Sequence, residues 1–124
     1  MLQFFVAGLG GFFGAAFRFA LGSWIHRVWP AAALPYGTMA VNILGCLLIG
    51  LLAGWRQPLE PGLRLFVMVG LLGGFTTFSA FALETLSLAQ QQQHMLAFIN
   101  VAAKLVFGLA AAWAGFEISR LIAN

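Results

Sequence analysis

Four long apolar stretches, separated by short polar or proline-containing breaks, decide what this chain can fold into. They cover approximately residues 3–24, 35–55, 63–89 and 95–122. Each is long enough to cross a bilayer as a helix, which takes about 20 mostly apolar residues. Only 7% of the residues are charged, against roughly 25% in soluble domains, and a small soluble globule could not bury so much apolar surface. The sequence therefore predicts an all-α, multi-pass membrane protein with a single four-helix domain over residues 1–124.

Charge and motif content argue against two classes of function. The six basic and three acidic residues are scattered, so the chain has no basic patch of the kind that binds nucleic acid. It also lacks a nucleophile with a base and an orienting partner, metal-binding His and Cys spacing, and a phosphate loop. We therefore expect neither an enzyme nor a nucleic-acid partner.

Polar residues within the spans are concentrated toward one side of the membrane. Four spans place both termini on the same side, here called side A, and the opposite side is side B. With a helix rise of about 1.5 Å per residue, the polar residues fall at the centre or in the side B half: Arg18, Thr38, Asn42, Thr76, Thr77, Ser79, Glu84, Asn100 and Lys104. The side A halves consist of residues 4–12, 46–54, 65–74 and 109–116, which contain no charged, amide or hydroxyl side chain. If the protein transports a polar species, only an antiparallel pair of chains supplies a continuous polar track, although packing alone does not require that arrangement.

The centre of the third span predicts a broken helix. Gly73 and Gly74 weaken helical structure, and the consecutive residues Thr76 and Thr77 add β-branched strain. Backbone carbonyls freed at such a break are typical cation ligands at membrane depth. The residues Phe78 and Phe81 follow at i, i+3 and share a helix face, where electropositive ring edges can contact a small anion. A glycine-rich packing face with lipid-facing phenylalanines explains the same residues equally well.

Glycine pairs in the spans predict where helices pack closely. Pairs of glycines four residues apart allow close helix packing in lipid; they are Gly10 and Gly14, Gly50 and Gly54, and Gly70 and Gly74.

Lys104 and Glu84 fall at similar depth in the side B half. Three interpretations of Lys104 are open: its head group snorkels to the interface, it pairs with Glu84, or it attracts anions directly.

Three motifs, in order along the chain, resemble the Fluc/CrcB family of fluoride channels over nearly the whole length. Residues 10–18 read GGFFGAAFR, similar to the family's G-G-x-x-G-A-x-x-R. Residues 37–45 read GTMAVNILG, similar to G-T-x-x-x-N-x-x-G. Residues 73–81 read GGFTTFSAF, similar to G-G-x-T-T-F-S-T-F.

The resemblance implies a dual-topology, antiparallel homodimer in the inner membrane that exports fluoride passively and relieves fluoride toxicity. It implies ring-edge contacts to the ion from Phe78 and Phe81, an amide donor at Asn42 and a polar track through Thr38. Strongly hydrated fluoride needs such donors in place of its water. The pore residues expected on this basis are Thr38, Asn42, Phe78, Ser79, Phe81 and Asn100. The carbonyls of Gly73 and Thr76 resemble the ligands of a structural sodium ion at the dimer centre, and Arg18 resembles a structural arginine near a pore mouth.

The chain departs from the family pattern at two places. Ala80 stands where a threonine is usual, which removes one hydroxyl group. In the fourth span, Asn100, Lys104 and Gly108 occupy a stripe where the family often has an aromatic or amide residue followed by small hydroxyl residues. Asn100 fits as a hydrogen-bond donor, Lys104 does not fit a track that binds weakly, and Gly108 offers no side chain.

Two other functions remain as alternatives. A small multidrug-type, proton-coupled transporter also has four spans and dual topology, but it needs an acidic residue in the first span, whose one ionisable residue here is Arg18. A non-transporting assembly subunit would use its intramembrane polar residues only to hold helices together.

Overall fold

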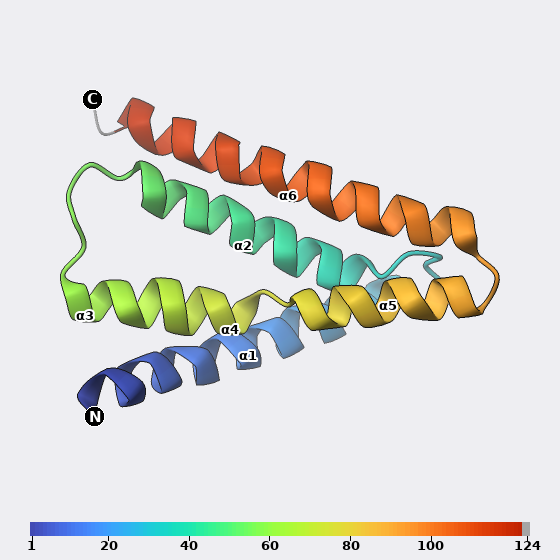
Figure 1. Cartoon of the computed structure of the whole chain (residues 1–124), viewed down its shortest axis with the longest axis horizontal. Coiled ribbons are helices and arrows are strands. Elements are labelled where there is room, and N and C mark those ends of the chain that lie inside the picture. The colour runs from blue at the N-terminus through green and yellow to red at the C-terminus, as the bar shows by residue number, and fades with distance from the viewer. Residues whose placement is uncertain (123–124) are drawn as a thin grey trace.

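The computed structural model describes residues 1–122, and four helical spans lie side by side in it (Figure 1). The first, second and fourth spans are single helices: α1 (Leu2–Val28), α2 (Tyr36–Gly54) and α6 (His94–Ile122). The third is built from four pieces: α3 (Pro61–Arg64), η1 (Leu65–Leu72), α4 (Gly73–Phe75) and α5 (Phe78–Gln90).

All four segments are long and apolar enough to cross a membrane, so the predicted spans are confirmed. The largest difference in their boundaries is at α1, which continues to Val28 rather than ending near residue 24. The N-terminus and the end of α6 lie at the same end of the bundle (Figure 1). This end is side A, and the loops that follow α1 and α5 lie on side B.

The third span is interrupted where the sequence predicted a break. Thr76 and Thr77 have extended backbones, with φ/ψ of −79°/157° and −149°/116°, and the ribbon loses its coil between α4 and α5 (Figure 1). The Thr77 hydroxyl then accepts a hydrogen bond from the Ala80 N–H at 3.2 Å, which caps α5 as an N-cap threonine does. The π-helical turns of η1 were not predicted, since their residues are uniformly apolar.

Glycines set the closest contacts between helices. α2 packs mainly on α6, and α1 packs mainly on η1 and α4. A β-carbon at Gly14 would collide with the backbone oxygen of Leu71, and one at Gly50 would collide with that of Ala112. All six glycines of the predicted pairs lie in such contacts, so their assignment to helix packing is confirmed.

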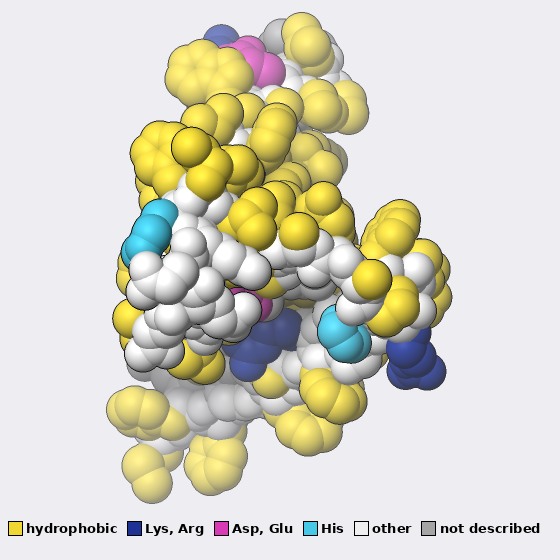
Figure 2. Space-filling view, turned by 90° about the vertical axis from the view of Figure 1, so that its right-hand side faces the viewer, with side chains coloured by type: hydrophobic (Ala, Val, Ile, Leu, Met, Phe, Trp, Pro, Cys, Tyr) yellow, Lys and Arg dark blue, Asp and Glu magenta, His cyan; other side chains and the backbone are white. Residues whose placement is uncertain are grey.

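Polar groups lie inside the bundle while large hydrophobic side chains cover its periphery. Among the described residues, the buried polar or charged side chains are Asn100, Lys104 and Ser119. Seen from the side B end, charged side chains of both signs lie deep in a hollow bordered mainly by polar side chains and backbone, and the hydrophobic side chains lie farther out (Figure 2). This distribution suits a protein whose outside is lipid and whose interior holds polar groups.

Candidate functional site

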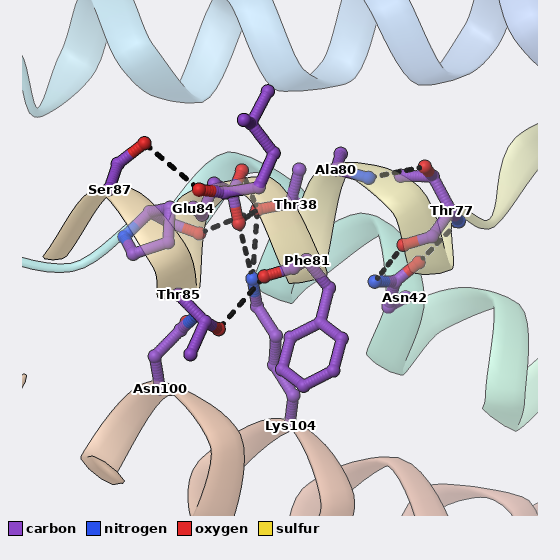
Figure 3. A network of polar contacts seen from close by, with 12 residues as sticks. Thr38, Asn42, Thr77, Ala80, Phe81, Glu84, Thr85, Ser87, Asn100 and Lys104 are labelled. Carbon is purple, nitrogen blue, oxygen red and sulfur yellow. Dashed lines mark hydrogen bonds and ion pairs between the residues drawn. The ribbon is translucent and has the colours of Figure 1, made fainter. Parts of the chain in front are cut away.

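Polar side chains from the four spans meet at the helix break and in the side B half next to it. α1 contributes Arg18, α2 contributes Thr38 and Asn42, and α6 contributes Asn100 and Lys104. The third span supplies the remaining partners, which begin with Thr76 at the break and continue from Thr77 to Thr85 in α5 (Figure 3). The sequence predicted their common depth, and the structure adds which of them touch.

Asn42 satisfies the backbone at the break. Its Oδ1 accepts from the Thr77 N–H at 2.8 Å, and its Nδ2 donates to the Thr77 carbonyl at 3.1 Å (Figure 3). Unwound backbone at membrane depth needs such partners. An amide carries two N–H donors, so the predicted role of Asn42 as a donor to fluoride depends on its second N–H.

The break also releases carbonyl oxygens from their helical partners. In a continuous helix, the Gly73 carbonyl would accept from the Thr77 N–H, which here donates to Asn42. The Thr76 carbonyl would accept from the Ala80 N–H, which here donates to the Thr77 hydroxyl. Oxygens of this kind suit a monovalent cation. Arg18 donates to the Thr76 carbonyl at 3.3 Å, so a sodium ion there would have to use the other lone pair of that oxygen.

Lys104 and Glu84 form an ion pair inside the bundle. Lys104 Nζ lies 2.6 Å from Glu84 Oε2, and their side chains are 5% and 25% exposed. The Thr38 hydroxyl lies 2.7 and 2.8 Å from the two carboxylate oxygens and accepts from Lys104 Nζ at 3.1 Å (Figure 3). Of the interpretations left open by the sequence, the pair is confirmed. The snorkelling interpretation is wrong, because the ammonium group is held in the interior by the carboxylate.

Phe78 and Phe81 share one face of α5, as predicted, with ring centroids 5.3 Å apart. Phe78 is 77% exposed on the single chain, whereas Phe81 is partly buried and its ring centroid lies 5.4 Å from Lys104 Nζ. Ser79 is exposed, and its hydroxyl lies 3.3 Å from that of Thr77. The polar groups around Thr38, Asn42, Glu84 and Lys104 are here called the interior polar cluster. The face with Phe78 and Phe81 joins this cluster to the surface of the chain.

Two cavities lie on either side of the Lys104–Glu84 pair. The first, called the side B cavity, has a volume of about 520 Å³; its lining includes His26, Trp29, Thr38, Glu84, Ser87 and Gln91. The second, called the phenylalanine cavity, has a volume of about 370 Å³; its lining includes Asn42, Cys46, Thr77, Phe78, Phe81 and Lys104. The sequence did not reveal the side B cavity, because the loop of residues 29–35 that forms much of its wall has no motif.

Asn100 does not line either of these cavities. It is fully buried, and its Nδ2 donates at 2.9 Å to the hydroxyl of Thr85, a residue that sequence reasoning missed. Thr85 in turn donates to the Phe81 carbonyl at 2.8 Å. Asn100 thus supports the backbone of α5 through Thr85, and its predicted role as a direct donor to fluoride stays a prediction.

A family model described as CrcB-like protein, Camphor Resistance (CrcB), matches residues 5–116. The chain belongs to the CrcB family. Proteins similar to this chain over nearly its whole length are named "Fluoride-specific ion channel FluC". The relative from Stutzerimonas stutzeri is 42% identical over 94% of this chain and 96% of its own length. The relative from Elusimicrobium minutum is 42% identical over 97% of this chain and 95% of its own length.

Another relative, from Pseudomonas putida, has the same name and is 46% identical over 90% of this chain and 91% of its own length. The resemblance read from the three motifs is therefore confirmed. Membership of the CrcB family and the four helices of spanning length identify the chain as a multi-pass protein of the cell membrane.

Proposed function

We propose that this chain is a fluoride-selective channel that exports fluoride passively across the cytoplasmic membrane and so relieves fluoride toxicity. Its relatives are named as fluoride-specific ion channels. The observation that carries the proposal is the interior polar cluster between two cavities, which extends from the side B loops to the paired phenylalanine rings. These groups offer a small anion hydrogen-bond donors and ring edges one after another. Conduction requires several weak sites of this kind and not one site that binds the anion tightly.

In this proposal each side chain replaces part of the water around fluoride. Asn42 offers its second amide N–H, and Ser79 offers a hydroxyl close to the break. Thr38 extends the polar track into the side B cavity. Phe78 and Phe81 present ring edges, which attract an anion without holding it as strongly as a free cation would.

The working unit in this proposal is an antiparallel homodimer with two pores. The polar cluster lies at the centre and in the side B half of each chain, whereas the side A stretches 4–12, 46–54, 65–74 and 109–116 carry no charged, amide or hydroxyl side chain. The largely exposed Phe78 ring gives the track a way out to the surface of one chain, where a second copy in the opposite orientation would continue it. Gly73 and Thr76 carbonyls from both copies would hold the structural sodium ion at the centre.

Fluoride efflux from proteoliposomes tests the function directly. Vesicles loaded with fluoride and carrying the purified chain are expected to release it when valinomycin and potassium balance the charge, with no proton gradient. Chloride-loaded vesicles are expected to retain their chloride. Efflux that requires a proton gradient would favour a coupled transporter, and the absence of fluoride efflux from folded protein would favour an assembly subunit.

Cross-linking tests the orientation of the two copies. A Gln3→Cys chain and a Gln91→Cys chain, both also carrying Cys46→Ala, are co-expressed with different tags. Gln3 begins the first span on side A, and Gln91 lies in a side B loop. An antiparallel pair puts both cysteines on the same membrane face, so a spacer reagent is expected to join the differently tagged chains. A parallel pair separates them by the roughly 30 Å hydrocarbon core, and products linked only through identical positions would contradict the proposal.

A further inference from the structure

Lys104 lines the phenylalanine cavity and carries a buried ammonium group. Its side chain is 5% exposed, and it lies beside Phe81 at the boundary between the two cavities. Glu84 and Thr38, which hold it, line the side B cavity instead. An anion that enters from side B therefore passes the carboxylate first and the ammonium group second.

One donor of this ammonium group is available for a ligand. Lysine has three N–H donors and no acceptor. Two are used, by Glu84 Oε2 at 2.6 Å and by Thr38 Oγ1 at 3.1 Å. The third has no hydrogen-bond partner within residues 1–122, and the nearest aromatic group is the Phe81 ring. Asn42 lines the same cavity, and its second amide N–H likewise has no hydrogen-bond partner among the described residues.

We propose that Lys104 binds fluoride within the pore and that Glu84 is the counter-ion that keeps this binding weak enough for release. This inference rests on the proposed function. A lone ammonium group in a low-dielectric site would hold a small anion too tightly for conduction. Glu84 is in direct contact with the ammonium group and neutralises most of its charge, while the third N–H remains a charge-assisted donor. An unpaired lysine would bind fluoride too tightly for conduction. Paired with Glu84, Lys104 instead forms a site that binds fluoride weakly enough to release it.

Single-channel conductance, recorded in planar bilayers over a range of fluoride concentrations, separates this role from a purely structural one. Lys104→Gln removes the charged donor and is expected to raise the half-saturating fluoride concentration about tenfold, a typical effect for one charge-assisted hydrogen bond. Glu84→Gln leaves the lysine uncompensated. It is expected to lower the half-saturating concentration about tenfold and to reduce the maximal current, because release becomes slower.

The double variant Lys104→Gln with Glu84→Gln covers the case in which a single variant fails to fold, because it leaves no unpaired charge. Its half-saturating concentration is expected to be about tenfold higher than that of the unmodified chain. Arg120→Gln and Glu117→Gln are matched controls, since these residues form an exposed ion pair on side A; both are expected to leave half-saturation unchanged.

The two proposals fail in different ways. An unmodified chain that folds and carries no fluoride current would overturn the proposed function. A normal fluoride current in the unmodified chain, with half-saturation unchanged in the Lys104 and Glu84 variants, would overturn only the role of the lysine. In that case the ion pair would be a structural contact between α5 and α6.

Discussion

Replacing Phe81 by isoleucine is expected to abolish fluoride efflux from proteoliposomes, with a fall in rate of at least about 100-fold. Isoleucine keeps an apolar side chain of similar bulk but has no electropositive ring edge. A dehydrated fluoride ion would then face hydrocarbon at the step between Lys104 and the exposed Phe78 ring. The same loss is expected for Phe78→Ile, because the two rings form one continuous face.

Two other phenylalanines, replaced in the same way, are the controls for this experiment. Phe98 and Phe107 on α6 are largely exposed, and neither lines the phenylalanine cavity. Phe98→Ile and Phe107→Ile are therefore expected to leave the efflux rate within about twofold, since a conservative apolar change at an exposed site has small effects. Size-exclusion chromatography of all four variants is the check on folding, and each is expected to elute as the unmodified chain does. Efflux at the unmodified rate in both Phe78→Ile and Phe81→Ile would contradict the role assigned to the rings.

The course of the chain through the membrane could be predicted because the signals are local. Apolar length sets a span, and proline or polar residues end it, so the four predicted spans match the observed helices closely. The break at Thr76 and Thr77 follows from the glycine pair just before it. The π-helical turns of η1 could not be predicted, because Leu65–Leu72 carries no residue that distinguishes a π-helix from an α-helix.

The contacts of the site were less predictable, because they depend on how the helices are rotated against one another. Their positions in the sequence predicted that Lys104 and Glu84 lie at a similar depth in the membrane. Depth alone could not distinguish an ion pair from a lysine whose head group reaches the interface. Packing of α5 on α6 decides this in favour of the pair. In the same way, the motif singled out Asn42 as a pore donor, whereas its contacts to both polar backbone groups of Thr77 required the structure.

Removing either partner of the Lys104–Glu84 pair is expected to destabilise the protein strongly. Within residues 1–122, Lys104→Ala leaves the Glu84 carboxylate with the Thr38 hydroxyl as its one side-chain partner. Glu84→Ala leaves a buried ammonium group without its counter-charge. Breaking one side of a buried pair typically costs about 3–5 kcal/mol, and each single variant is expected to lose stability of this order in reversible unfolding from mixed micelles.

The double variant Lys104→Ala with Glu84→Ala is expected to be less destabilised than the sum of the two single variants, because no charge then remains unpaired. The same cycle on Arg120 and Glu117, an exposed pair 3.2 Å apart, is expected to give a coupling below about 1 kcal/mol. Additive effects at Lys104 and Glu84 would show that the two charges do not stabilise each other. The 2.6 Å contact would then be energetically neutral, and the shallow fluoride site proposed at Lys104 would lose its counter-ion.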